Sequence, residues 1–370
     1  MKLAEQDQRP LSRLNDTVDA GWTRLASRMP MAGGARRMLV LVVVAFASFA
    51  ALKPAVFLSV TNLQNIAVAT PEIGVIAVAM MLAMLTGGID LSLVSTANLS
   101  AITMSTLFTA ISANDPGQAE RMVPVIVLAG LGVGLLGGLV NGLLVAGLGI
   151  TPILATLGTM QIYNGIAVAW TGGETLYGAP SSLTALGLST VGGIPTLFIL
   201  FVAVAIAIGV LVSRTPLGLR IQLQGANPTA ARYSGIASRA ILLRTYTLTG
   251  LLGGIAGVLF LARNPTASAD YGASYVLLVI VIAVLGGTNP SGGAATVFGV
   301  VLATLTLQIV SSGFTAMRLS AYEYAIAQGV ILVAVMAFDS VRQRRRRRRR
   351  RPWRTALRRG SPDSSRPGTP

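Results

Sequence analysis

Few side chains in this sequence could carry out a chemical reaction. The chain contains no His and no Cys, which excludes imidazole and thiol catalysis, Cys/His metal sites and disulfides. A P-loop needs a Lys directly after Gly to reach nucleotide phosphates, and neither Lys2 nor Lys53 follows a Gly. Any ATP would therefore have to be bound by another polypeptide. We predict that the chain is not an enzyme and holds no catalytic residue, metal or cofactor.

The remaining chemical candidates are polar side chains inside apolar segments. Gln161, Tyr163 and Asn164 stand together in one such segment, where they could line a substrate pathway for a polyhydroxylated ligand or join neighbouring helices. An acidic residue inside a membrane segment is a functional hypothesis by default. Glu72 and Glu323, however, lie near the expected outer ends of their segments. We expect both to reach water as interfacial anchors, with a pathway or docking role as the alternative.

Two short glycine-rich turns share the pattern Gly-Gly-x-(Asp/Asn)-x-Ser. They are GGIDLS at 87–92 and GGTNPSGG at 286–293, and their first residues are 199 positions apart, which indicates an internal repeat. Asp90 is predicted to cap the helix that follows, because a carboxylate accepts backbone N–H bonds at a helix N-terminus. The compatible functional alternative is a turn that moves when the inner face opens. The candidate gating residues are Gly87, Gly88, Asp90, Ser92, Gly286, Gly287, Ser291 and Gly292.

Glycines also recur at helical spacing along two apolar segments. They are Gly130, Gly134, Gly138 and Gly142 in one segment, and Gly250, Gly254 and Gly257 in the other. A glycine stripe on one face of a membrane helix allows close backbone approach. We predict tight, static helix packing at both stripes. The alternative is that these faces slide when the protein changes conformation.

The composition places these residues in a membrane. Of 370 residues, 53% are hydrophobic and 11% are charged, and the mean hydropathy is +0.68. A soluble chain of this length could not bury so much apolar surface, so we predict an all-α polytopic membrane protein. About ten segments approach the roughly 20 residues that a bilayer core requires. They are 38–60, 66–85, 91–113, 122–149, 151–170, 194–212, 240–262, 271–285, 294–312 and 321–338.

The basic residues set the expected orientation. With both termini in the cytoplasm, 25 of the 29 Lys and Arg residues lie on that side and 4 lie outside, in agreement with the positive-inside rule. We expect a cytoplasmic tail at 1–37, a transmembrane domain at 38–340 and a disordered Arg-rich cytoplasmic tail at 341–370. The octa-arginine run 344–351 is expected to attract anionic membrane lipids, at about 1 kcal/mol per Arg. We predict no nucleic-acid partner.

One long polar break interrupts the apolar sequence. Residues 213–239 carry four arginines and no acidic residue. We expect no helix in 216–226, because this stretch contains a proline and two glycines. Pro228, in contrast, suits the first position of a short helix that Gly235 closes. A short, basic, capped helix between two membrane segments predicts a docking element for a soluble cytoplasmic partner.

Several ordered motifs resemble one family, the membrane-spanning permeases of ribose-type sugar ABC importers. The family patterns are a TGGIDLS turn, an NGLLV…P…ATLGT segment, a GxNPxAAR-x-SGI cytoplasmic loop and a late GGT…SGG turn. The corresponding stretches are LTGGIDLS at 85–92, NGLLV at 141–145 with TP at 151–152 and ATLGTM at 155–160, GANPTAARYSGI at 225–236, and GGTNPSGG at 286–293. The resemblance covers about residues 60–340.

The resemblance implies a permease subunit in a bacterial inner membrane that imports a monosaccharide such as ribose, xylose, arabinose, galactose or rhamnose. The implied partners are a separate ABC ATPase that binds the ATP, a periplasmic or lipid-anchored sugar-binding protein, and a second permease copy or a paralogue. Dimerisation of the ATPases would push the short cytoplasmic helix. The implied coupling residues are Gly225, Asn227, Pro228, Ala230, Ala231, Arg232 and Gly235.

Two departures from the family pattern leave the substrate open. Val94 stands where the family often has Gly, and residues 275–278 read YVLL where many relatives carry acidic residues. Permeases for autoinducer-2, branched-chain amino acids or nucleosides are alternatives within the superfamily. A self-sufficient secondary transporter is a further alternative. It would need a buried ion-coupling carboxylate at mid-membrane, and we expect none at the centres of the segments.

Overall fold

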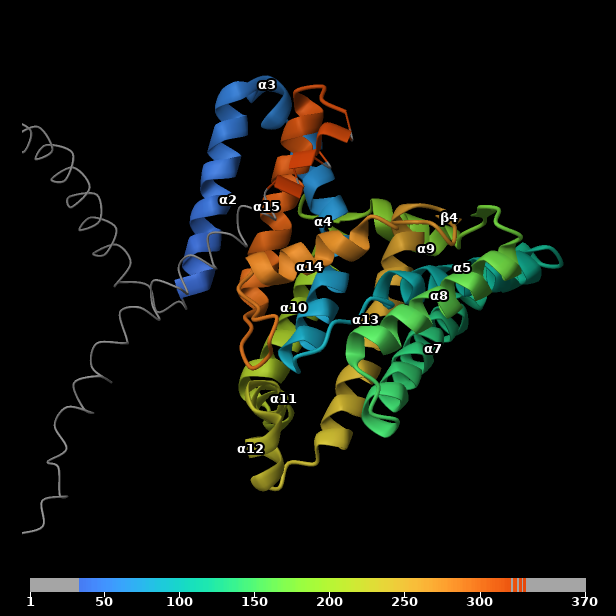
Figure 1. Ribbon diagram of the computed structural model, residues 1–370. Helices are drawn as coiled ribbons and strands as arrows, with labels where there is room; N and C mark the ends of the chain where they lie inside the picture. Colours follow the sequence, from blue (N-terminus) through green and yellow to red (C-terminus); the bar gives the residue numbers. More distant parts are fainter. Residues whose placement is uncertain (1–32, 321, 325, 328, 331–370) are drawn as a thin grey trace, which may run out of the picture. The chain divides into compact units, whose positions relative to one another are not determined.

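A computed structural model describes residues 33–320, 322–324, 326–327 and 329–330 (Figure 1). The chain divides into two compact units, 1–317 and 318–370. The expected C-terminal tail, most of the expected segment 321–338 and residues 1–32 lie outside the described residues. The remainder of the expected N-terminal tail already belongs to a helix, which begins at Gly33.

The described part of the first unit is predominantly helical, as predicted. In chain order its helices are α2 (Gly33–Leu52), α3 (Pro54–Phe57), α4 (Val60–Leu85), α5 (Leu93–Ser112), α6 (Pro116–Arg121), α7 (Val123–Gly142), the π-helix η1 (Leu143–Gly147), α8 (Pro152–Thr171), α9 (Ser181–Leu188), α10 (Thr196–Arg214), α11 (Pro216–Ala226), α12 (Pro228–Tyr233), α13 (Ser238–Arg263), α14 (Tyr275–Leu285) and α15 (Val297–Ala316). Two short antiparallel pairs join β1 (Leu176–Tyr177) with β4 (Thr266–Ala267), and β2 (Thr190–Val191) with β3 (Ile194–Pro195).

Six helices in the described part of the chain are long and apolar enough to cross a membrane. They are α4, α5, α7 together with η1, α10, α13 and α15. Each corresponds to an expected segment, and two further expected segments coincide with α8 and α14. The expected segment 38–60 does not form one helix, because α2 ends at Leu52 and the separate helix α3 begins at Pro54. The apolar part of α2, Met38–Leu52, and the 11-residue α14 are shorter helices. Helix α8 has 20 residues, but polar residues such as Gln161 and Asn164 lower its hydropathy.

Helix α4 forms the centre of the first unit. Every residue from Thr70 to Leu85 is buried, and α13, α15, α10 and α14 contact this helix. A helix that is apolar on all sides must be enclosed by other helices or by lipid. Here the neighbouring helices enclose it (Figure 1).

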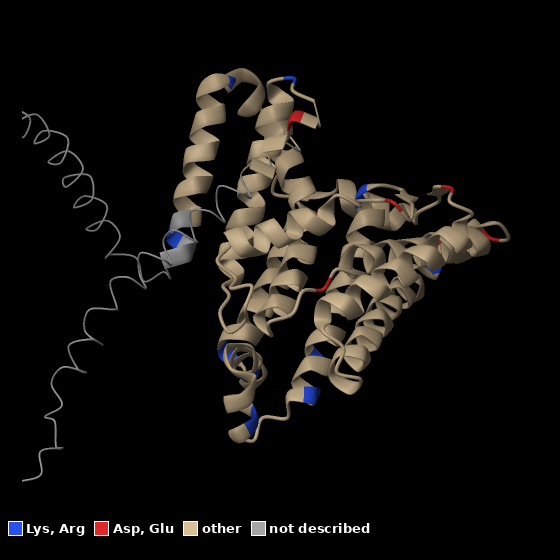
Figure 2. Cartoon of the chain, viewed as in Figure 1, with Lys and Arg blue, Asp and Glu red and all other residues tan. Residues whose placement is uncertain are grey.

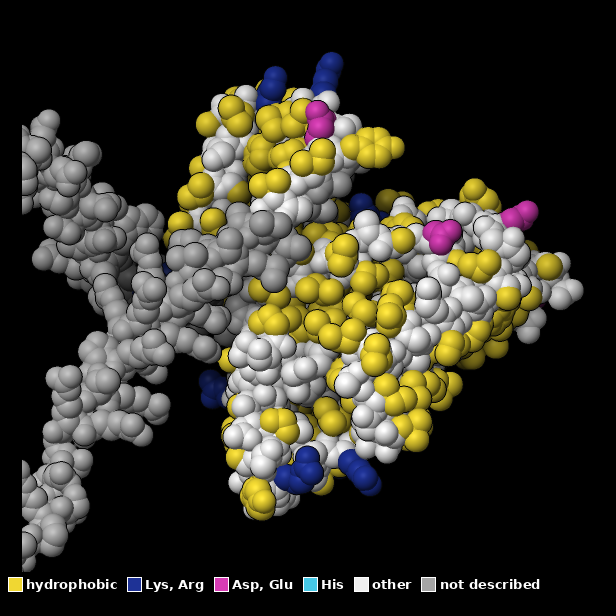
Figure 3. All heavy atoms as spheres, viewed as in Figure 1, with side chains coloured by type: hydrophobic (Ala, Val, Ile, Leu, Met, Phe, Trp, Pro, Cys, Tyr) yellow, Lys and Arg dark blue, Asp and Glu magenta, His cyan; other side chains and the backbone are white. Residues whose placement is uncertain are grey.

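The outer helices, in contrast, keep large apolar side chains on their surfaces. Leu128 of α7 and Leu154 of α8 are each 65% exposed, and Ile206 of α10 is 61% exposed. Figure 3 shows hydrophobic side chains spread across one face of the molecule. Exposed apolar surface on this scale marks a membrane or protein contact, as expected for membrane-embedded helices.

The two glycine stripes face each other, which confirms the prediction of tight packing. Helices α7 and α13 make the most extensive contact in the fold. A Cβ added at Gly134 would lie 2.6 Å from the carbonyl oxygen of Gly250, and one added at Gly138 would lie 2.7 Å from the Cα of Gly250. Real Cβ atoms do not come so close, so the backbones approach as far as glycine permits.

We expect Gly138→Val to lower the thermal unfolding midpoint of the detergent-solubilised protein. Overpacking of a close interface typically costs about 1–3 kcal/mol, and here the obstructing atoms belong to the rigid backbone of α13. The control is Gly132→Val on the same helix, because no atom lies within 4 Å of an added Cβ at Gly132. Equal midpoints for the two variants would contradict this account of the interface.

Candidate functional site

The polar break between α10 and α13 contains two helices, not one. The short helix α12 forms as predicted: Pro228 occupies its first turn, and the Asn227 side chain accepts a hydrogen bond from the Ala230 N–H at 3.0 Å. Gly235 follows with φ +77°, the left-handed conformation that ends helices. On this helix Ala231 is buried at 4% exposure, whereas Tyr233 is 91% exposed.

The expectation that no helix forms in 216–226 is wrong, because this stretch is helix α11. Thr215 accepts a hydrogen bond from the Gly218 N–H at 3.2 Å, and Pro216 lies in the first turn, where its missing N–H has no consequence. Both glycines are buried. A Cβ at Gly218 would clash with the backbone of Val212. The glycines therefore allow close contacts and do not interrupt the helix.

The end of α11 brings the two predicted glycine turns together. Gly225 lies against the carbonyl oxygen of Leu85, and a Cβ added there would also be 2.7 Å from the Gly293 nitrogen. The Gly293 N–H itself donates to the Leu85 carbonyl at 3.0 Å. A Cβ at Gly292 would lie 2.9 Å from the Gly87 nitrogen. One predicted coupling residue, Gly225, thus meets two predicted gating residues, Gly87 and Gly292, at one contact. We call this contact the coupling junction (Gly87, Gly225, Gly292, Gly293 and Leu85).

The two turns have the same local geometry, but their helix ends and their Asx turns are not separated by the same number of residues. The Gly87 N–H donates to Met84, and the Gly287 N–H donates to Val284, in both cases three residues back. Gly87 and Gly287 also have positive φ, +86° and +92°. In the structure Gly87 therefore corresponds to Gly287, 200 positions later. The shared sequence pattern instead matches Gly87 with Gly286, 199 positions later.

The second half of each turn follows the predicted spacing. The Asp90 carboxylate accepts a hydrogen bond from the Ser92 N–H at 3.1 Å, and the Asn289 side chain accepts one from the Ser291 N–H at 3.1 Å. Such bonds over two residues define Asx turns. The first turn therefore has one additional residue between its helix end and its Asx turn.

Asp90 is not the cap of the next helix. Helix α5 begins at Leu93 with Ser92 in the capping position, and no side-chain cap bond is formed. The Asp90 side chain is instead fully buried. It accepts hydrogen bonds from the Ser92 hydroxyl at 2.7 Å and from the Thr249 hydroxyl of α13 at 3.0 Å. Asp90 binds a residue of α13, a helix distant in sequence, and a local sequence rule for helix caps cannot predict such a contact.

A chain of hydrogen bonds extends from Asp90 into α7 and α8. The Asn141 amide donates to the Ser92 hydroxyl at 2.7 Å, and the Thr159 hydroxyl donates to the Asn141 side-chain oxygen at 2.6 Å. The turn after α4 is therefore tied to α7, α8 and α13. Any movement of this turn has to move or break this network.

The three candidate pathway residues on α8 do not share one environment. The Tyr163 hydroxyl donates to the Gly137 carbonyl at 2.9 Å, and the Asn164 amide donates to the Ala269 carbonyl at 3.2 Å. In this structure these two residues join α8 to other parts of the fold, which agrees with the second alternative, that they join neighbouring helices. Gln161 is exposed.

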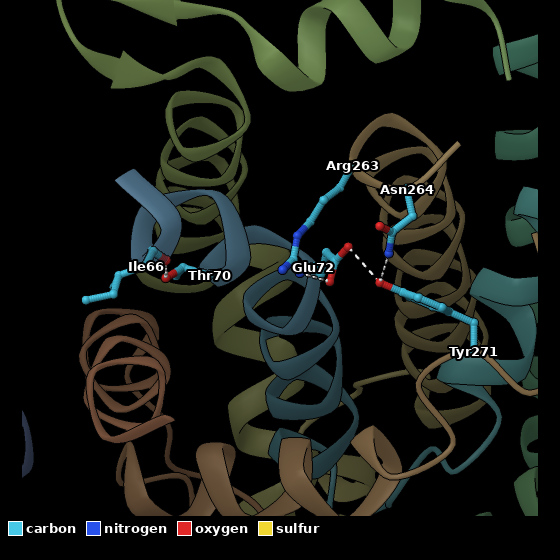
Figure 4. A network of polar contacts seen from close by, with 6 residues as sticks. All are labelled: Ile66, Thr70, Glu72, Arg263, Asn264 and Tyr271. Carbon is cyan, nitrogen blue, oxygen red and sulfur yellow. Dashed lines mark hydrogen bonds and ion pairs between the residues drawn. The ribbon is translucent and has the colours of Figure 1, made fainter. Parts of the chain in front are cut away.

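The expectation that Glu72 reaches water is wrong. Its side chain is 0% exposed and forms an ion pair with Arg263, with Nη1 2.6 Å from Oε2. The Tyr271 hydroxyl donates to the other carboxylate oxygen at 3.0 Å, and the Asn264 amide donates to the Tyr271 hydroxyl at 2.7 Å (Figure 4). Helix α4 begins at Val60, six residues before the expected start at 66, so Glu72 lies near its middle. Arg263 at the end of α13 and Tyr271 of the following loop contact it there.

Glu323, in the second unit, behaves as an anchor at a helix start. Its carboxylate accepts a hydrogen bond from the Ser320 N–H at 2.5 Å, and its own N–H donates to the Ser320 hydroxyl at 3.4 Å. This reciprocal pair is a capping box. Both residues are exposed.

Membrane-length helices around a buried polar turn, joined to a short exposed basic helix, define a membrane permease. The chain belongs to the family described as the branched-chain amino acid transport system permease component, which matches residues 62–336. This places it in a bacterial inner membrane as a multi-pass protein and confirms the expected resemblance to sugar-type ABC permeases. In the described part of the chain no group of His, Cys, Asp and Glu side chains could hold a metal ion.

Several relatives are similar over most of their length. The autoinducer 2 import system permease protein LsrC of Escherichia coli is 31% identical over 289 residues, which cover 76% of this chain and 80% of that protein. LsrC of Klebsiella pneumoniae is 33% identical, with coverage of 80% and 84%. The galactose/methyl galactoside import permease protein MglC of Salmonella typhimurium is 33% identical over 296 residues, with coverage of 77% and 88%. No solved structure matches the chain.

Proposed function

We propose that this chain is the transmembrane permease subunit of an ATP-binding-cassette importer that moves a monosaccharide into the cell. The observation that carries the proposal is its likeness to LsrC and MglC, whose names state that they import autoinducer 2 and galactose or methyl galactoside. Both solutes are small and polar. The coupling junction supports the same function, because it connects an exposed helix to turns inside the helix bundle.

We also propose the finer topology, with about ten spans and both termini in the cytoplasm. The six membrane-length helices would be joined by α2, α8, α14 and the segment 321–338. Figure 2 shows Lys and Arg positions, coloured blue on the ribbon, at α11, α12 and the first turns of α13. By the positive-inside rule this end faces the cytoplasm. Labelling of single cysteines, introduced into the natural Cys-free sequence, with an impermeant thiol reagent tests the orientation.

The proposed partners follow from the function. The ATP would be bound by a separate ABC ATPase that docks on α12. A periplasmic or lipid-anchored binding protein would deliver the sugar, and a second permease copy or a paralogue would complete the transporter. Residues 344–351 are proposed to contact anionic lipids. No nucleic-acid partner is proposed.

The direct test is reconstitution. The chain is purified in mild detergent with its co-purifying proteins, placed in liposomes and assayed for uptake of ribose, xylose, arabinose, galactose, rhamnose and autoinducer 2. We expect ATP-dependent accumulation of one sugar, and no ATP hydrolysis by the purified chain alone. Autoinducer 2, branched-chain amino acids or nucleosides as the only accumulated solutes would replace the proposed substrate.

One structural observation keeps the secondary-transporter alternative testable. Asp90 is a fully buried carboxylate in the turn between α4 and α5, outside the centres of the expected segments, and it accepts hydrogen bonds from hydroxyl and N–H groups. A buried carboxylate of this kind could bind a coupling ion. Accumulation by the chain alone on a proton or sodium gradient, without ATP, would favour this alternative over the importer.

We expect Arg232→Glu to uncouple ATP hydrolysis from uptake. Arg232 is exposed on α12, and reversal of its charge would place repulsion at the proposed ATPase contact. ATPase activity of the assembled complex and sugar uptake are measured together. The matched control is Arg220→Glu, which makes the same charge change at an exposed position of α11 and should retain coupling. Normal coupling in both variants would remove α12 from the proposed contact.

A further inference from the structure

A short segment between β4 and α14 is held by side chains of several membrane helices. The carbonyl oxygen of Ala269 accepts hydrogen bonds from the Asn98 amide of α5 at 2.7 Å and from the Asn164 amide of α8 at 3.2 Å. The Asn98 amide also donates to the carbonyl of Tyr271 at 2.9 Å. We call residues 268–271 the outer segment, because the expected topology places the connection after α13 outside the cell.

Helix α4 also holds the outer segment, through the side chain of Glu72. The Tyr271 hydroxyl donates to Glu72 of α4, which is also paired with Arg263 at the end of α13 (Figure 4). The Arg263 cation balances the charge of Glu72, and the Tyr271 hydroxyl satisfies the other carboxylate oxygen. The outer segment therefore lies where α4, α5, α8 and the end of α13 meet.

The polar groups that hold this segment are unusual for apolar helices. Asn98 is 3% exposed, and its side-chain oxygen is buried without a hydrogen-bond partner in the described part of the chain. A buried amide oxygen without a partner costs free energy. Such a group is expected to find a partner in another state of the protein. A ligand hydroxyl that replaces the segment's carbonyl would provide a donor for this oxygen and an acceptor for the amide.

The polar surface continues along α8. Gln161 precedes Asn164 by three residues, so the two side chains lie on neighbouring positions of one helix face. Gln161 is exposed, and Asn164 is partly buried. Amide side chains offer both donors and acceptors. Paired amides can therefore bind the adjacent hydroxyls of a neutral sugar without any charged partner.

We propose that the outer segment is a plug, and that Asn98, Asn164 and Gln161 form a hydroxyl-binding site for the sugar when the plug moves away. In the closed state the carbonyls of Ala269 and Tyr271 occupy the positions that sugar oxygens take in the open state. The exchange replaces the hydrogen bonds between amides and carbonyls by bonds of the same kind, whereas the Tyr271–Glu72 bond has to be broken when the plug moves. This inference rests on the proposed function and assigns the sugar's contacts within it.

A reversible cross-link tests the movement of the plug. The double variant Asn264→Cys/Tyr271→Cys places two thiols at the side-chain contact between the end of α13 and the outer segment, outside the proposed sugar site, in a chain with no natural Cys. The assembled importer is oxidised, or treated with a short bifunctional thiosulfonate, and uptake is assayed before and after reduction. We expect the cross-link to reduce uptake to background and reduction to restore it.

The control is the pair Val191→Cys/Ile194→Cys, which face each other across β2 and β3 and are exposed. Its cross-link should leave uptake unchanged. Unimpaired uptake by the cross-linked Asn264/Tyr271 variant would overturn the plug. If the wild-type importer accumulates no sugar of the test panel with ATP, the proposed function itself fails, and the sugar site fails with it.

Thiol labelling tests the sugar contact. In the single variant Asn164→Cys, reaction with an impermeant maleimide should be slow at rest and at least about tenfold faster during ATP turnover, as expected when a buried contact opens. Excess galactose, or the panel sugar that the wild-type importer accumulates, should slow the labelling again. The exposed control Asn114→Cys should label at one rate throughout. Labelling of Asn164→Cys that is independent of ATP would overturn the plug, and labelling unaffected by sugar would overturn the site.

Discussion

Replacement of Gly225 by alanine should reduce sugar uptake by the assembled importer at least about tenfold. The new methyl group would collide with the Leu85 carbonyl and with the Gly293 nitrogen, 2.7 Å away. All these atoms belong to the backbone, so no side chain can move aside. The end of α11 must then separate from both glycine turns. The push that the ATPase exerts on α12 would no longer reach the helix bundle.

The expected signature is continued ATP hydrolysis with little uptake. Gly292→Ala tests the same contact from the opposite side, because Gly292 has φ +89° and a Cβ there would lie 2.7 Å from the Gly225 oxygen. Gly132→Ala is the matched control, since an added Cβ at Gly132 meets no atom within 4 Å. Full uptake in both junction variants would show that the turns do not transmit the coupling signal.

Loss of the Glu72 carboxylate should strongly destabilise the fold. Removal of one partner of a buried ion pair typically costs about 3–5 kcal/mol, because the other charge stays buried without compensation. In Glu72→Ala the guanidinium of Arg263, 32% exposed, loses its partner and the Tyr271 hydroxyl loses its acceptor. We expect a clear fall in the thermal unfolding midpoint of the detergent-solubilised chain.

The double variant Glu72→Ala/Arg263→Ala separates the pair from other effects. Removal of both charges should recover part of the lost stability, because no unpaired charge remains. The exposed ion pair between Arg121 and Asp115, at 3.6 Å with side chains 75% and 51% exposed, provides the control. Asp115→Ala should change the midpoint little. If Glu72→Ala had as small an effect as Asp115→Ala, the Glu72 ion pair would have no structural role.

Local rules explain what could be predicted around α12. Asn227 followed by Pro228 specifies a helix start through bonds that reach only three residues along the chain. The same rules failed for α11, although its proline occupies an equivalent first position. Its glycines were expected to break the helix. The structure requires these glycines for close contacts. Gly225 lies against Leu85, which is distant in sequence, and Gly218 lies against Val212 of the preceding helix.

The sequence by itself determined the membrane class, most of the apolar helices, the capped helix α12, the tight glycine stripes and the family. Each of these depends on composition or on spacing within a few residues. Only the tertiary structure decided that Glu72 and Asp90 are buried, and that Gly225 meets both glycine turns. Those features depend on which distant backbones approach each other. Helix packing fixes that approach, and no local pattern records it.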